Sequence, residues 1–138
     1  MKIKIQQADV PNKNNRIYPK HLLEKISEEW TKTFIVERRA FVCKKSIIDS
    51  DNNCCGCVNL KDVVGIVKNI GVEDDWLIAD VECLPDIPSA KKLFLLLENG
   101  YASVRMSGIS SLNISQNGNY VVADDYELIS LIITENPA

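Results

Sequence analysis

Two serines on a predicted strand are the first candidates for chemistry in this chain of 138 residues. Residues 101–107 alternate small or apolar residues with polar ones, and Ser103 and Ser107 occupy polar positions of that pattern. A serine hydroxyl becomes an effective nucleophile only when a base removes its proton. The single histidine, His21, lies in the first turn of a helix predicted over residues 20–30, next to the charged Lys20. A solvent-exposed role for His21 is favoured over catalysis, because a general base needs a fixed partner.

A cluster of thiols is the second candidate site. Cys54, Cys55 and Cys57 lie within four residues, and thiolates are typical zinc ligands. The usual paired C-x-x-C spacings are missing, however, and only Cys43 or Cys83 remains to complete a set of four cysteine ligands. We therefore favour buried or loop thiols over a zinc site, and we expect no cofactor. The odd count of five cysteines favours a reducing compartment over a disulfide framework.

The elements that must position these residues are mostly short strands. The Asn117-Gly118 pair predicts a hairpin between two of them, and Gly108 marks a bulge or a close approach of another backbone. The pattern predicts an α+β, mainly antiparallel β fold: a partly closed β-barrel of about seven strands with two flanking helices, in one domain over residues 1–138. The predicted helices are 20–30, with Leu22, Leu23, Ile26 and Trp30 on its buried face, and 90–98, with Leu93, Leu96 and Leu97 inward; the predicted strands are 2–8, 33–43, 58–70, 76–83, 101–107, 110–114, 120–122 and 126–134.

Composition excludes several classes of protein. The formal net charge of -3 argues against a general nucleic-acid-binding protein, which normally carries a basic face. No apolar run approaches the roughly 20 residues that span a bilayer. The polar residues that follow Met1–Ile5 exclude the core of a signal peptide, so a cytosolic location is the default.

Four blocks of the sequence, in order, resemble the prohead (capsid-maturation) proteases of tailed bacteriophages, distant relatives of the herpesvirus assemblin proteases. Each block matches weakly, whereas the ordered set covers nearly the whole chain. The first resembles the family's Asn-x-Asn-x-Arg-x-Tyr-Pro block, the second the strand after its catalytic-histidine loop, the third its helix, glycine turn and nucleophile strand, and the fourth its terminal strand. These blocks are Asn12–Pro19, Val58–Gly65, Pro88–Gly108 and Asp124–Ala138.

The chain departs from the family at the catalytic positions that the resemblance implies. Lys44 stands where the family places its histidine, and Arg105 and Met106 stand at the two serine positions when Gly108 is matched to the family's final glycine. An active enzyme would need an unusual pair, drawn from Ser103 or Ser107 and from Lys44 or His21. A lysine acts as a base only when it is desolvated. Cys43 with His21 is a still weaker pair.

Because removal of triad members costs several orders of magnitude in rate, the favoured function is non-enzymatic. We expect an auxiliary, decoration or minor capsid protein built on a degenerate prohead-protease fold. The alternatives are an active prohead serine protease that cleaves capsid and scaffold proteins during head maturation, and a small cytosolic binding module without a viral context. Expected partners are the major capsid protein, other virion proteins or further copies of the chain, without a membrane or direct nucleic-acid contact. The expected location is the virion capsid, with the host cytoplasm during assembly. Charge alone also suggests Arg105 as an ion-pair partner of Asp124 or Asp125.

Overall fold

A computed structural model describes the backbone of residues 1–44, 58–114 and 118–134. Its main sheet has six strands in the order β1-β5-β4-β3-β9-β6, and a second sheet has three in the order β2-β8-β7. The strands are β1 (Lys2–Gln7), β2 (Arg16–Ile17), β3 (Phe41–Cys43), β4 (Val63–Glu73), β5 (Trp76–Cys83), β6 (Ser103–Ile109), β7 (Leu112–Ile114), β8 (Tyr120–Val122) and β9 (Glu127–Thr134). The helices are α1 (Lys20–Trp30) and α2 (Pro88–Glu98), with a π-helical turn η1 (Thr31–Ile35) and a 3₁₀ turn η2 (Leu60–Asp62).

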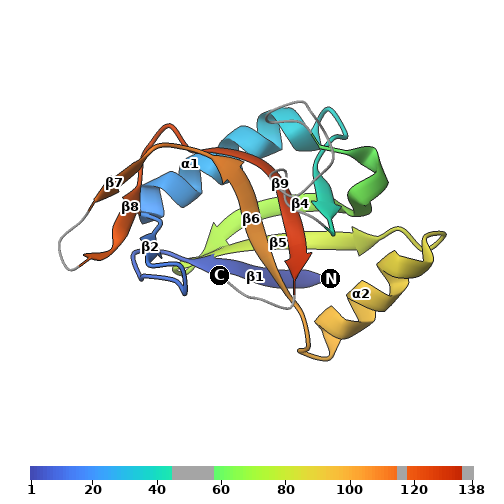
Figure 1. Cartoon of the computed structure of the whole chain (residues 1–138). Helices are drawn as coiled ribbons and strands as arrows, with labels where there is room; N and C mark the ends of the chain where they lie inside the picture. The colour runs from blue at the N-terminus through green and yellow to red at the C-terminus, as the bar shows by residue number, and fades with distance from the viewer. Residues whose placement is uncertain (45–57, 115–117, 135–138) are drawn as a thin grey trace.

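The six-stranded sheet curls on itself. In Figure 1, β6 and β9 run at a steep angle to β1, β5 and β4, and β1 comes into contact with β6 without pairing with it. The neighbouring strands pair antiparallel except β3 and β9, which are parallel. The predicted α+β, mainly antiparallel and partly closed barrel with two helices is confirmed.

Helix α1 covers the main core. Its predicted bounds and buried face are confirmed, because Leu22, Leu23, Ile26 and Trp30 are all buried. The Trp30 Nε1–H also donates to the Leu128 carbonyl at 2.8 Å, which ties the helix to β9. Helix α2 packs against β4 and β5. Its predicted inward face, Leu93, Leu96 and Leu97, is partly wrong, because the buried residues of α2 are Ala90 and Phe94. No helix in the described ranges is long and apolar enough to cross a membrane.

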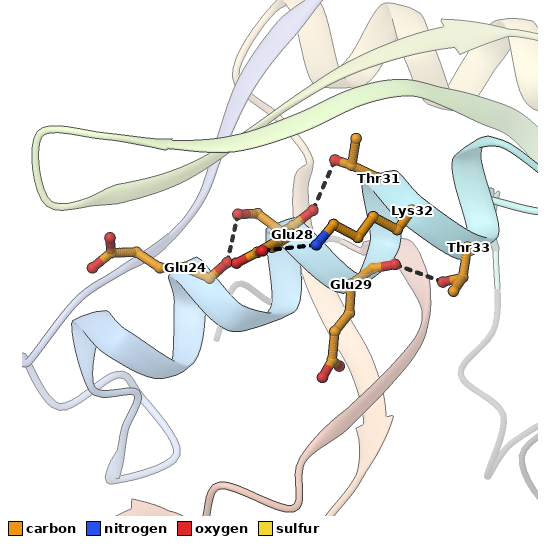
Figure 2. Close-up of polar contacts among 7 residues, drawn as sticks. Glu24, Glu28, Glu29, Thr31, Lys32 and Thr33 are labelled. Atoms are coloured by element: carbon orange, nitrogen blue, oxygen red, sulfur yellow. Dashed lines mark hydrogen bonds and ion pairs between the residues drawn. The ribbon is translucent and has the colours of Figure 1, made fainter.

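The strand predicted over residues 33–43 is wrong for most of its length. The chain instead continues α1 into the turn η1, and only Phe41–Cys43 forms a strand. Figure 2 shows the side chains involved: the Thr31 hydroxyl donates to the Ser27 carbonyl at 2.8 Å and the Thr33 hydroxyl to the Glu29 carbonyl at 2.6 Å. Phe34 then stacks on Trp30, with ring centroids 5.1 Å apart. Aromatic packing and these side-chain bonds outweigh the strand propensity of the segment.

The other strand predictions differ less from the structure. Strand β4 starts at Val63, after the turn η2, and extends to Glu73, so the predicted strand 58–70 is shifted toward the C-terminus. The short strand β2 was missed. The predicted hairpin is confirmed by the antiparallel pairing of β7 with β8, and Gly118 has a φ of 78°. The register shift between Ser107 and Gly108 confirms the bulge.

Candidate functional site

A row of polar side chains crosses three neighbouring strands on one face of the main sheet. Ser107 on β6 pairs with Ser130 on β9, and Cys43 on β3 pairs with Ile132 on β9. Since alternate residues of a strand share a face, Cys43, Ile132, Ser130 and Ser107 lie on the same side of the sheet. Cys43 and Ile132 form a small apolar cluster with Val63, separate from the main core. We call Cys43, Ser130 and Ser107 the polar row.

The polar row is closed to solvent. The exposed fractions are 2% for Cys43, 0% for Ser130 and 6% for Ser107. Asp62, in the turn η2, is also buried, and its carbonyl accepts a hydrogen bond from the Lys44 N–H at 2.8 Å. A peptide substrate that must reach a hydroxyl or a thiol in this row therefore meets a covered surface.

Electrostatics leaves Cys43 protonated. Burial raises the pKa of its thiol to about 11; a hydrogen bond with Ser130 lowers this pKa in part, and the nearby Asp62 carboxylate raises it further. The thiolate is the nucleophilic form of cysteine, so at neutral pH this thiol is inert. Among the described residues, the Ser130 hydroxyl meets no partner at full hydrogen-bond geometry, so its interaction with the Cys43 thiol is a weak and poorly directed one.

The candidate bases lie away from a serine. The His21 Nε2 lies 2.9 Å from Asp124 Oδ1 on the exposed surface, before the start of β9, and the Lys25 Nζ donates to the Asp124 carbonyl at 2.6 Å. Lys44 follows β3 directly and is exposed, whereas a catalytic lysine needs a desolvated ammonium. The structure does not bring His21 to Ser103 or Ser107.

The remaining candidate residues, Ser103, Arg105 and Met106, make contacts within the sheet and the core. The Ser103 hydroxyl donates to the Thr134 carbonyl at 3.5 Å. Arg105 is partly buried opposite Ile132, and Met106 packs against the main core. The suggested ion pair of Arg105 is wrong, because Asp124 pairs with His21 and Asp125 binds the Ser111 hydroxyl at 2.6 Å.

The thiol cluster Cys54, Cys55 and Cys57 lies outside the described residues. Among the residues that the structure does describe, no group of three or more metal-ligating side chains is close enough to hold an ion. The zinc site therefore stays an untested prediction.

Sequence reasoning missed Ser130 and Asp62. Ser130 could have been identified from the sequence, because it is the one polar residue in the apolar run Leu128–Ile133. Asp62 could not have been identified in this way, because the residues around it in the sequence do not indicate that it is buried.

The raised pKa of Cys43 predicts a loss of stability at alkaline pH. The folded pKa of about 11 exceeds the ordinary value of 9.0, so the unfolded chain loses this proton first as the pH rises. The stability that the neutral thiol contributes is complete below pH 9.0 and is lost as the pH passes through about 11. We expect the free energy of unfolding to fall by about 2 kcal/mol over this window from Cys43 alone.

Urea unfolding at a series of pH values measures this effect, with Cys43→Ala as the comparison. Tyr18 and Tyr126 also have raised pKa values, chiefly through burial, and contribute a slope of the same sign that the variant keeps. The difference between the two slopes isolates Cys43. Equal slopes for the two proteins would contradict the prediction.

The fold is similar to that of a solved protein structure over almost the whole chain. The bacteriophage T4 capsid assembly protease gp21 superposes with a TM-score of 0.76, at 19% sequence identity, over 96% of this chain and 79% of the T4 chain. No protein-family model matches the sequence. No curated protein matches it either. The sequence resemblance and the superposition agree, and the chain has the fold of a bacteriophage capsid-maturation protease.

Proposed function

We propose that this protein is a non-enzymatic component of a bacteriophage capsid, an auxiliary, decoration or minor capsid protein on a prohead-protease fold. The observation that carries the proposal is the burial of the polar row. Its thiol is held neutral and its serines are covered. A serine hydroxyl is an effective nucleophile only when a base removes its proton, and a covered hydroxyl also cannot reach a peptide bond.

The capsid context of the proposal comes from the fold. The structural neighbour is described as a capsid assembly protease of bacteriophage T4. A protein can keep its fold after it has lost the catalytic activity associated with that fold. A domain with this fold but without the catalytic groups can therefore still bind a phage capsid. The major capsid protein, or another virion protein, is then the expected partner, and the virion is the expected location.

An active prohead serine protease is the second candidate. It is favoured by one observation: Ser107 pairs directly with Ser130, and Cys43, on the strand next to Ser130, is followed by the exposed Lys44. Activity would require an opening of the polar row that lets Lys44 reach Ser107 and removes water from its ammonium.

Two measurements separate the candidates. The purified chain, its Ser107→Ala variant and its Ser103→Ala variant are incubated with a fluorophosphonate probe and with peptides from the major capsid protein. We expect neither labelling nor cleavage above background for any of them. Labelling or cleavage that disappears on replacement of one serine would overturn the proposal.

The second measurement is the copy number in purified virions, by quantitative mass spectrometry against the major capsid protein. A structural component is retained at a fixed ratio in mature particles. A maturation protease is lost or degraded after cutting, so absence of the chain from mature virions would contradict a structural role.

A further inference from the structure

A small polar cavity lies where the second sheet meets the bulge of β6. It has a volume of about 90 Å³ and is lined by Arg16, Tyr18, Gly108, Ser110, Val122 and Tyr126. One water needs at least about 10–15 Å³ of such volume, so the cavity has room for a small polar group such as a carboxylate. None of its lining residues belongs to the polar row, although Gly108 directly follows Ser107 in the chain.

Two buried tyrosines, Tyr18 and Tyr126, form the rigid wall of this cavity. Tyr18 and Tyr126 are exposed by only 5% and 7%, and their rings meet edge to face at 5.6 Å. Burial raises the pKa of both hydroxyls, so both remain protonated donors at neutral pH. The Tyr18 hydroxyl has hydrogen bonds with the Arg16 guanidinium and with Tyr126, and both lower its pKa, as expected when its oxygen is the acceptor.

This arrangement leaves one donor over. A phenol oxygen that accepts from Arg16 and Tyr126 still carries a proton of its own to donate. No hydrogen bond from Tyr18 to an acceptor occurs among the described residues. The Tyr18 O–H and those N–H groups of the Arg16 guanidinium that do not reach Tyr18 are therefore available to an acceptor in the same cavity.

The charge of Arg16 is also unbalanced. Arg16 is exposed and forms no ion pair with a carboxylate in the described ranges. Two acidic residues in the turn before β9 have other partners: Asp124 pairs with His21, and Asp125 accepts hydrogen bonds from the Ser111 hydroxyl at 2.6 Å and the Ser111 N–H at 3.3 Å. A guanidinium with a neighbouring hydroxyl donor matches the two oxygens of a carboxylate.

We propose that the cavity between Arg16, Tyr18 and Ser110 binds a single carboxylate group. Asp125, which is hydrogen-bonded to Ser111 beside the cavity, disfavours a doubly charged ligand such as phosphate. The carboxylate comes either from a small free acid or from an Asp or Glu side chain of a partner protein. The site is independent of the capsid role proposed above.

Nuclear magnetic resonance titration tests the site. The folded chain, labelled with ¹⁵N, is titrated at constant ionic strength with acetate, with acetyl-aspartate amide, with acetyl-glutamine amide as a neutral control, and with inorganic phosphate. We expect saturable shifts of the Arg16 Nε–H and of the Gly108 and Ser110 amides with both carboxylates. Tighter binding of the capped aspartate than of acetate would identify a protein side chain as the source, and the reverse would identify a free acid.

Variants assign the binding to the named residues. Arg16→Gln should weaken binding about tenfold or more, and Tyr18→Phe, which keeps the ring in place, by about threefold to tenfold. Arg39→Gln is the matched control, because that guanidinium lies 3.9 Å from the Phe34 ring and pairs with Glu37. The proposal is overturned if neither carboxylate saturates, if phosphate binds more tightly, or if Arg16→Gln binds as well as Arg39→Gln.

Discussion

Replacement of Gly108 by alanine should destabilise the protein by about 3 kcal/mol or more, enough to unfold a marginally stable domain. A methyl group at this position would collide with the Glu127 carbonyl and would lie 2.6 Å from Cζ of Tyr126. The carbonyl belongs to β9, which pairs with β6 across the bulge, so it cannot retreat without disrupting the ladder. The Tyr126 ring is fixed by its edge-to-face contact with Tyr18.

Urea unfolding, followed by tryptophan fluorescence, measures this loss. Gly71→Ala is the matched control: Gly71 also lies in a strand of the main sheet, but a methyl group there would meet nothing within 4 Å. We expect that variant to stay within about 0.5 kcal/mol of the parent protein. A Gly108→Ala variant as stable as Gly71→Ala would refute the close approach of β6 and the Tyr126 ring.

The role of Gly108 as a bulge was predictable, because a glycine that interrupts an alternating strand has few other uses. Helix α1 was predictable because its apolar residues recur with a clear helical period, which is the strongest sequence signal for an amphipathic helix. The segment 33–43 was not predictable, because its conformation depends on Trp30, which stacks on Phe34 and binds β9. No residue of the segment itself indicates this partner.

The candidate site shows the same limit. Ser107 was identified on its strand, but the polar row depends on the parallel pairing of β3 with β9 and on the register that sets Ser130 opposite Ser107. Pairings between strands far apart in sequence are set by the whole fold, and a register shift of one residue would turn every side chain to the other face. The residue types, and the absence of a histidine at the position where the protease family has one, were therefore predictable, whereas the burial of the polar row required the structure.

Leu131→Ala should cost about 3 kcal/mol of stability, with a range of roughly 2–5 kcal/mol for buried leucines. Leu131 is fully buried at the centre of β9, where it pairs with Val42 on β3 and with Met106 on β6. Its side chain lies in the main core, on the face opposite the polar row. The strands on both sides fix the backbone, so the core cannot collapse fully into the space left by the truncated side chain.

The same substitution tests whether the core holds the polar row closed. Leu131 follows Ser130 directly, so looser packing of β9 should expose Cys43 more often and speed its alkylation by iodoacetamide, measured by peptide mapping. Leu95→Ala is the matched control, since Leu95 is 52% exposed on α2, and we expect it to change stability by no more than about 0.5 kcal/mol and to leave Cys43 labelling unchanged. Leu131→Ala could instead lower stability while Cys43 is labelled at the parent rate. That result would show that the packing of the core does not control the opening of the polar row. The residues that cover the outer face of the row would then be what keeps it closed.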